Sequence, residues 1–344
     1  MSASARPRLP LPRGPESALV INALTRNDPR ALRRSAMVPA DDVDALNDHD
    51  IQLALACCYE LHYDSFAGVD DAWEWDPDLL ARRARLEQAF TQRLEDAVGP
   101  APSLAPHAVV PALGALAHTA SGPSLSRFME HQGRLEHMRE FCVHRSAYQL
   151  KEADPHTWMI PRLRGRAKAA AVTIQYDEYG QGTAAAMHSE LFATTMRALD
   201  LDPSYGAYLD LLPATTLATG NLVSMFGLHR GWRAACVGHL ALFEMTSVGP
   251  MGRYSNALKR FGIGTDARNF YDVHVEADAW HEQLAQTGLV SGFLETEPTA
   301  GARVLFGARA LIEVEGRMTR ALLDAWSHGN TSLLAPLPAR QVAS

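Results

Sequence analysis

Cysteine is scarce in this chain of 344 residues, and its four copies form no framework. Cys57 and Cys58 are adjacent, while Cys142 and Cys236 stand alone in apolar stretches. A disulfide-stapled domain or a cysteine-based zinc site needs cysteine pairs at characteristic spacings. The pattern fits neither, and it predicts a reducing compartment, the cytoplasm.

Membrane, nucleic-acid and secretion signals are also missing. No run of about eighteen apolar residues is free of polar groups, so no transmembrane helix is expected. The net charge of -7 is spread without a basic stripe, which argues against non-specific nucleic-acid binding. Residues 1–20 carry arginine and proline but contain no apolar core of a signal peptide, and this predicts a disordered leader.

Strand signals are rare, because alternating runs rich in valine and isoleucine are nearly absent. Alanine, leucine, arginine and glutamate dominate, and apolar residues recur at helical spacing in most windows. Hydrophobic residues make up 47% of the chain, which is enough for one large core. The sequence therefore predicts an all-α bundle.

Proline and glycine clusters predict where the helices end. Helices are expected over 48–63, 78–98, 107–119, 123–153, 161–178, 183–200, 203–218, 219–247, 251–261, 266–287 and 302–327. The proline-rich stretch 99–106 is the best candidate for a domain boundary. We expect a disordered leader (1–20), an N-terminal helical extension (21–103), a main domain (104–330) and a C-terminal tail (331–344).

The most informative chemical motif is His274-x3-Asp278-x2-His281 in the expected helix 266–287. At about 100° per residue, the three side chains fall within a sector of about 60°. Two imidazoles and a carboxylate on one face form a nitrogen and oxygen site suited to iron or manganese. Taken alone, the motif fits equally well with surface histidines that pair with carboxylates one turn away.

Glu244 adds to this motif, because it lies in the apolar run 240–245, where an unpaired carboxylate is costly to bury. Glu152 ends another expected helix. Glu178 and His188 are ten residues apart, and a straight helix would place them roughly 80° apart. A break at Gly180 would help both side chains to reach one centre. Helical diiron-carboxylate sites need such a set of carboxylates and histidines from several helices.

With these residues, the sequence resembles the haem-oxygenase-like diiron oxidases and oxygenases, a family also labelled iron-containing redox enzymes. The resemblance covers about residues 120–290. It implies a haem-oxygenase-like helical bundle that binds two Fe(II) ions and no haem. It assigns seven metal ligands: Glu152, Glu178, His188, Glu244, His274, Asp278 and His281.

The resemblance also implies how the two irons share these ligands. One iron is expected on Glu178, His188 and His274, and the other on Glu152, Asp278 and His281. Glu244 would lie at or between the metals. The second iron site is expected to be weak and to fill only in the reduced state.

The implied activity is that of an iron-dependent oxidoreductase with O2 as co-substrate and a small-molecule substrate. N-oxygenation of a small amine or amino-acid-like molecule in specialised metabolism is favoured. Oxidative decarboxylation or C–C cleavage of an amino or fatty acid by the same site is the alternative. A metal-independent enzyme of cofactor metabolism and a non-catalytic helical binding protein of the same fold stay open. A homodimer and an external electron donor are further expectations.

Other titratable residues are expected to have structural roles. Glu60, His62 and Asp64 alternate, and on a helix they diverge too far to chelate one ion, so local hydrogen bonds are expected. His239 is expected to be a packed histidine or a residue that orients a ligand. Lys151 lies near an expected ligand, and either a substrate carboxylate or solvent fits its charge.

Overall fold

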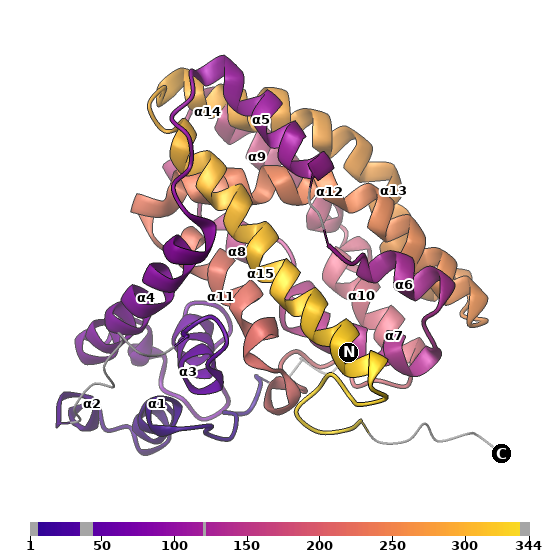
Figure 1. Cartoon of the computed structure of the whole chain (residues 1–344). Coiled ribbons are helices and arrows are strands. Elements are labelled where there is room, and N and C mark those ends of the chain that lie inside the picture. The colour runs from indigo at the N-terminus through magenta and orange to yellow at the C-terminus, as the bar shows by residue number, and fades with distance from the viewer. Residues whose placement is uncertain (1–5, 35–43, 120–121, 338–344) are drawn as a thin grey trace.

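The computed structural model describes residues 6–34, 44–119 and 122–337, without the side chains of residues 34, 119 and 276–279. Over these residues every regular element is helical, as predicted (Figure 1). The α-helices are α1 (Pro15–Arg26), α2 (Arg30–Arg34), α3 (His49–Glu60), α4 (Pro77–Val98), α5 (Pro106–Thr119), α6 (Leu125–His131), α7 (Leu135–Gln149), α8 (Asp154–Thr157), α9 (Gly165–Glu178), α10 (His188–Ala198), α11 (Ala214–Leu228), α12 (Arg233–Arg260), α13 (Thr265–Leu284), α14 (Ser291–Thr296) and α15 (Gly301–Ser327). A π-helical segment, Ala285–Val290, joins α13 to α14.

Helix α12 is the central element of the bundle. It packs along α13 on one side and along α15 on another, and α6, α11, α5 and the π-helical segment also contact it (Figure 1). The N-terminal helices α1 to α4 form the expected helical extension at one side, where α3 packs on α11 and α4 on α15. The domain division at residue 103 stays a prediction.

Helices α12 and α15 cross at two glycines. A Cβ atom at Gly238 would overlap the carbonyl oxygen of Val304, and one at Gly307 would overlap that of Ala235. The two contacts are one helical turn apart on both helices, so the backbones touch directly. Only glycine allows so close an approach. The crossing therefore fixes α15 against the helix that carries Glu244.

Two of the expected helix breaks are placed wrongly. Helix α12 continues through Pro250, although an interior proline costs about 3 kcal/mol. Packing of both halves of α12 against other helices outweighs that cost. The junction expected between 218 and 219 lies instead at 229–232, between α11 and α12. This stretch is apolar nearly all round, so periodicity does not locate the ends of its helices.

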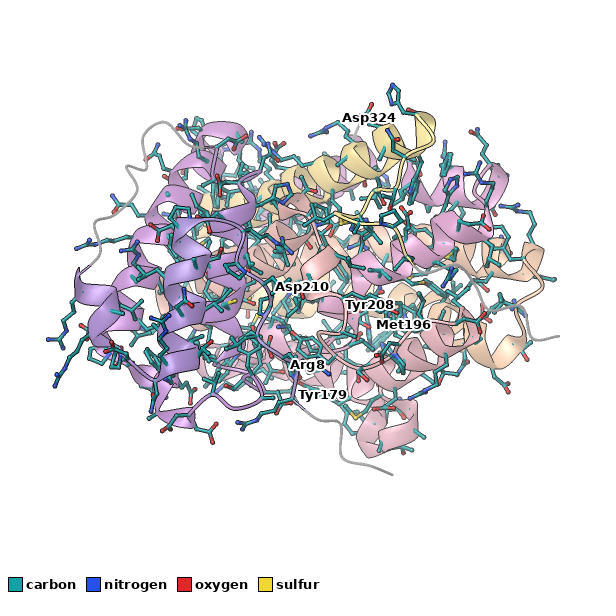
Figure 2. The ribbon with its side chains drawn as sticks, turned by 90° about the horizontal axis from the view of Figure 1, so that it is seen from below. Arg8, Tyr179, Met196, Tyr208, Asp210 and Asp324 are labelled. Carbon is teal, nitrogen blue, oxygen red and sulfur yellow. The ribbon has the colours of Figure 1, made fainter. Side chains whose placement is uncertain are left out.

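The described part of the expected leader is ordered, which corrects the prediction of disorder for residues 6–20. The Arg13 guanidinium donates hydrogen bonds to the carbonyls of Leu209 and Leu212, both at 2.6 Å. The Leu11 amide donates to Asp210, which is labelled in Figure 2, at 2.7 Å. Residues 15–20 form the start of α1. These contacts join segments about 200 residues apart, and composition alone does not reveal them. Residues 1–5 lie outside the described residues.

The helices were compared with the requirements for crossing a membrane. Within residues 6–34, 44–119 and 122–337, none combines the length and the apolar composition that a bilayer crossing requires.

We expect Gly307→Ala to lower the free energy of unfolding by about 2 kcal/mol, because the added methyl group meets backbone that cannot rotate away. Gly316→Ala is the control in the same helix. There a Cβ atom meets only the flexible Arg320 side chain, at 3.2 Å. The control should be neutral or more stable by up to about 1 kcal/mol. Chemical denaturation measures both changes, and equal stabilities of the two variants would contradict the backbone contact.

Candidate metal centre

Six of the seven predicted ligands come together in the interior of the bundle. They form two groups, in each of which one donor atom per residue lies within 4.8 Å of the others. The first ligand group is Glu152, Glu178, His188 and His274, and the second is Glu178, Glu244 and His281. All six residues are buried, from 0% exposed for His281 to 8% for Glu178. The side chain of Asp278 lies outside the described residues, so its role stays a prediction.

The two late histidines lie on one face of α13 and belong to different groups. His274 and His281 are seven residues apart, which is about two turns and about 10 Å along the helix. His274 faces Glu152, with 3.8 Å between Nε2 and Oε2. Nδ1 of His281 lies 3.4 Å from Glu244 and 3.8 Å from Glu178. The spacing of the motif therefore places the two histidines in different ligand groups.

This grouping differs from the expected division of ligands in two ways. Glu152 lies with His274 and not with His281, and Glu178, not Glu244, is common to both groups. The spacing along one helix predicts which side chains share a face. The level at which a second helix meets that face depends on tertiary packing, which the sequence does not display.

The turn after α9 brings Glu178 to His188. Glu178 is the last residue of α9 and His188 the first of α10, and their Oε2 and Nδ1 atoms are 2.7 Å apart. Gly180 has a φ of +63°, and a Cβ atom there would overlap the backbone of Ala186 and Met187. The predicted break at Gly180 is confirmed, and it has the predicted effect of joining the two side chains.

Glu152 lies in the turn between α7 and α8. The next residue, Ala153, has a φ of +77°, which is rare for a residue with a side chain. Its carbonyl accepts a hydrogen bond from the Gln175 side chain at 2.7 Å. This contact with α9 holds the turn that places Glu152 next to His274.

The charges of the first group favour an ionised carboxylate. Burial alone would raise the pKa of Glu178, but the hydrogen bond and the charge of His188, with those of His274 and His281, lower this pKa to about 2. An ionised carboxylate beside imidazoles is a donor set for a metal cation.

Each late histidine is oriented through one nitrogen and presents the other to the cluster. Nδ1 of His274 donates to the carbonyl of Phe270 at 2.6 Å, which directs Nε2 towards Glu152. Nε2 of His281 donates to Oδ2 of Asp177 at 3.0 Å, which directs Nδ1 towards Glu244. A carbonyl and a carboxylate can only accept here, so these partners fix the tautomers.

Asp177 is a positioning residue that the sequence analysis missed. Its only sequence signal was its place directly before Glu178, because its partner His281 is 104 residues away. Its other oxygen accepts a hydrogen bond from Gln181 at 2.9 Å. His239, by contrast, pairs with His156 at 3.1 Å, and burial lowers its pKa to about 3, as expected for a packed neutral histidine.

The donor set fits first-row metal ions. Imidazole nitrogens and carboxylate oxygens suit iron, and a carboxylate common to both groups can bridge two ions. By the ligand distances of zinc, about 2.1 Å, two donors of one ion lie at most about 4.2 Å apart. Donor atoms within 4.8 Å of one another thus need only small shifts to bind one ion. The buried His/Glu cluster can therefore hold metal ions.

The alternating residues at the end of α3 (Glu60) and in the turn after it (His62 and Asp64) have separate surroundings. Glu60 accepts hydrogen bonds from Lys151 and Tyr205, at 2.8 and 2.6 Å. His62 pairs with Glu74 at 3.3 Å, while the Asp64 side chain is 62% exposed. His62 bonds to a residue 12 positions away, whereas the partners of Glu60 lie 91 and 145 positions away, so the bonds of Glu60 are not the local ones that were expected.

Comparison with known proteins gives one family. A family model described as an iron-containing redox enzyme matches residues 139–316, which is more than half of the chain. The matched segment runs from α7 into α15 and contains all seven predicted ligands. A search of curated proteins finds no match.

We expect Gly180→Ala to weaken iron binding as well as folding, because the methyl group pushes His188 away from Glu178. Gly182→Ala is the matched control, since its φ of +82° is equally unfavourable but no atom lies within 4 Å of its Cβ position. Iron content after anaerobic loading and thermal unfolding are measured on both variants. An equal loss of iron in the two would contradict this role of the Gly180 turn.

We expect Asp177→Asn to lower iron affinity by about 10–100-fold without unfolding the protein, because an outer carboxylate orients its histidine. Competition with an Fe(II) chelator measures the affinity. Asp272→Asn is the control on the helix of His281, where the carboxylate accepts from Ser255 at 2.5 Å and is 45% exposed. Unchanged affinity in Asp177→Asn would show that His281 needs no such partner.

Proposed function

This chain belongs to the iron-containing redox enzyme family and is an iron-dependent oxidoreductase, and we propose that its buried cluster binds two Fe(II) ions and N-oxygenates a small amine with O2. The observation that carries the proposal is the carboxylate of Glu178, which belongs to two adjoining buried ligand groups. Two groups with a common carboxylate are the arrangement that a two-metal site requires.

The two ligand groups would each hold one ion. Glu152, Glu178, His188 and His274 would hold the first, and Glu178, Glu244 and His281 the second, with Asp278 as a further expected ligand. Bound iron supplies the one-electron redox chemistry with O2 that amino-acid side chains lack.

The chain itself contributes a small, largely closed space beside the first ligand group. A cavity of about 10 Å³ lies between Tyr148, His156, Phe243 and the ligand carboxylates. Burial and the charges of Glu152, Glu178 and Glu244 raise the pKa of Tyr148, so its hydroxyl keeps its proton. Tyr148 can therefore donate a hydrogen bond at the wall of this cavity.

This cavity has room for about one small group, and its lining favours a polar group over part of an acyl chain. His156, Gln175 and Ser247 bring polar atoms to the wall. An acyl chain would leave the buried Oε1 atom of Gln175 unpaired, because this atom has no hydrogen-bond partner among the described residues, and this costs about 1–3 kcal/mol. An amine can donate a hydrogen bond to it. Oxidative decarboxylation of a fatty acid is thus the weaker alternative for this site.

Thiol chemistry, one route open to a metal-independent relative, is disfavoured. Cys142 and Cys236 are fully buried, and burial raises the pKa of each thiol to about 12. A thiol with such a pKa stays protonated and is a poor nucleophile.

N-oxygenation also requires a source of electrons besides the amine. An amine, O2, two electrons and two protons give a hydroxylamine and water. The amine supplies two of the four electrons that O2 accepts, and the other two must come from elsewhere. We therefore include an external electron donor in the proposal.

We expect about two Fe(II) per chain after anaerobic loading, and about one or fewer in His281→Ala, because this variant removes a ligand of the second group. His131→Ala is the control. This imidazole is 68% exposed, and its ion-pair partner, Glu130, belongs to neither ligand group. Loaded protein is then exposed to labelled O2 with a panel of small amines, and mass spectrometry follows the label.

Three results would contradict parts of this proposal. No bound iron, or iron unaffected by His281→Ala, would remove the two-iron site. Bound iron with release of CO2 from an acid, and no label on nitrogen, would replace N-oxygenation by decarboxylation.

A further inference from the structure

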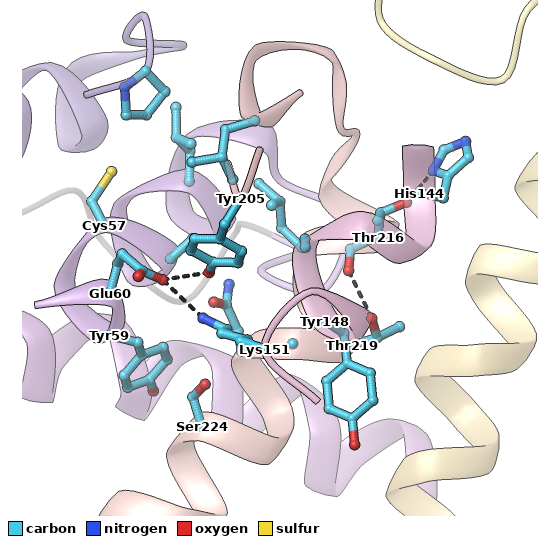
Figure 3. Close-up of a pocket in the computed structure, with 18 of the residues that line it drawn as sticks. Cys57, Tyr59, Glu60, His144, Tyr148, Lys151, Tyr205, Thr216, Thr219 and Ser224 are labelled. Atoms are coloured by element: carbon cyan, nitrogen blue, oxygen red, sulfur yellow. Dashed lines mark hydrogen bonds and ion pairs between the residues drawn. The ribbon is translucent and has the colours of Figure 1, made fainter. Parts of the chain in front are cut away.

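A second cavity lies between the N-terminal extension and the main bundle (Figure 3). Its volume is about 40 Å³, and α3, α7 and α11 supply most of its wall. Since about 10–15 Å³ of such space holds one water molecule, the cavity accommodates a group of about three heavy atoms. That is the size of a polar head group of a substrate.

Glu60 is the carboxylate in the wall of this cavity, and it is 4% exposed. Its Oε2 atom accepts from Lys151 and from Tyr205, and both bonds are drawn in Figure 3. Its Oε1 atom is also buried, yet it has no hydrogen-bond partner among the described residues. A buried charged acceptor without a donor is costly. One further donor would complete the site.

The other charged groups of the wall are engaged elsewhere. Arg145 donates two hydrogen bonds to Glu315, at 2.8 and 2.6 Å. Burial lowers the pKa of His144 to about 3, so this imidazole stays neutral. Only Lys151 offsets the charge of Glu60 by direct contact, at 2.8 Å, among the residues that the structure describes.

The surroundings of Glu60 favour a cationic donor. Nζ of Lys151 already lies over the rings of Tyr63 and Tyr205, at 4.1 and 5.1 Å from their centroids. These faces offset part of the Lys151 charge, and the Oε1 atom of Glu60, which has no donor of its own among the described residues, favours a charged donor over a neutral one. A primary ammonium has both the charge and the size that the cavity accepts.

The cavity adjoins the candidate metal centre. Tyr148 lines both this cavity and the smaller one beside the first ligand group. Lys151 and Glu152 are consecutive, and one lines the cavity while the other belongs to the first ligand group. The two spaces therefore have Tyr148 as a common wall residue.

We propose that this cavity binds a primary ammonium group of the substrate, with the Glu60 carboxylate as its acceptor. The proposal rests on the proposed function and adds to it a recognition site in the N-terminal extension. It implies a substrate whose ammonium group lies at Glu60 while a different position reaches the metal centre past Tyr148.

The test uses the full-length, iron-free protein and ligand-observed NMR with ethylammonium, which has three heavy atoms. Ethanol and acetate serve as neutral and anionic probes. We expect ethylammonium to bind, and Glu60→Gln to weaken its binding at least 10-fold. Glu87→Gln is the matched control in the extension, because this buried carboxylate is already bonded to Tyr59 and to His229, both at 2.9 Å.

A second variant covers the case in which Glu60→Gln does not fold. Gly220 lines the cavity from within α11, and no atom lies within 4 Å of its Cβ position. The Cβ atom of Gly220→Leu therefore meets no backbone, and the rest of its side chain takes up space at the wall of the cavity. We expect it to abolish ethylammonium binding while thermal unfolding stays unchanged.

Each outcome decides the proposal. Selective binding of ethylammonium that both Glu60→Gln and Gly220→Leu remove supports it. No binding to the wild type, binding to Glu60→Gln within two-fold of the wild type, or equal binding of ethanol overturns it. Because no iron is present, a failure of amine oxidation in loaded protein, with this binding retained, counts against the proposed function alone.

Discussion

The burial of three carboxylates at the centre of an apolar bundle is the constraint that the rest of the structure satisfies. Glu152, Glu178 and Glu244 come from different segments, and each is at most 8% exposed. A buried carboxylate is tolerated only where opposite charge or a metal is held close to it. The direct backbone contact of α12 with α15 holds Glu244 in place, and the turn at Gly180 holds Glu178 against His188. The helix packing thus holds these negatively charged carboxylates close to one another.

Much of this arrangement could be predicted from local spacing. The motif on α13 and the break at Gly180 follow from helical geometry and from the backbone freedom of glycine. The pairing of Glu152 with His274 could not be predicted, because it depends on the level at which two segments pack. Asp177 was missed for the same reason. The ordered leader depends on contacts between residues about 200 positions apart, such as Leu11 with Asp210.

The N-terminal extension contributes more than a cover for the bundle. Glu60 on α3 bonds to Lys151 beyond α7 and to Tyr205 in a later loop, so one carboxylate ties three segments together. The family match begins at residue 139, after the extension. The residues that distinguish one substrate from another can therefore lie outside the part of the chain that the family has in common.

At the turn before Ala153, the side chains of two consecutive residues, Lys151 and Glu152, lie in different places. Lys151 lies against Glu60, and Glu152 lies in the first ligand group. In the proposed two-iron site, a ligand that shifts Lys151 would act on a metal-binding carboxylate one residue away. Such coupling is reciprocal, since each ligand changes the affinity for the other by the same factor. An enzyme built in this way would hold its iron differently with and without substrate, and O2 chemistry would be linked to the arrival of the molecule to be oxidised.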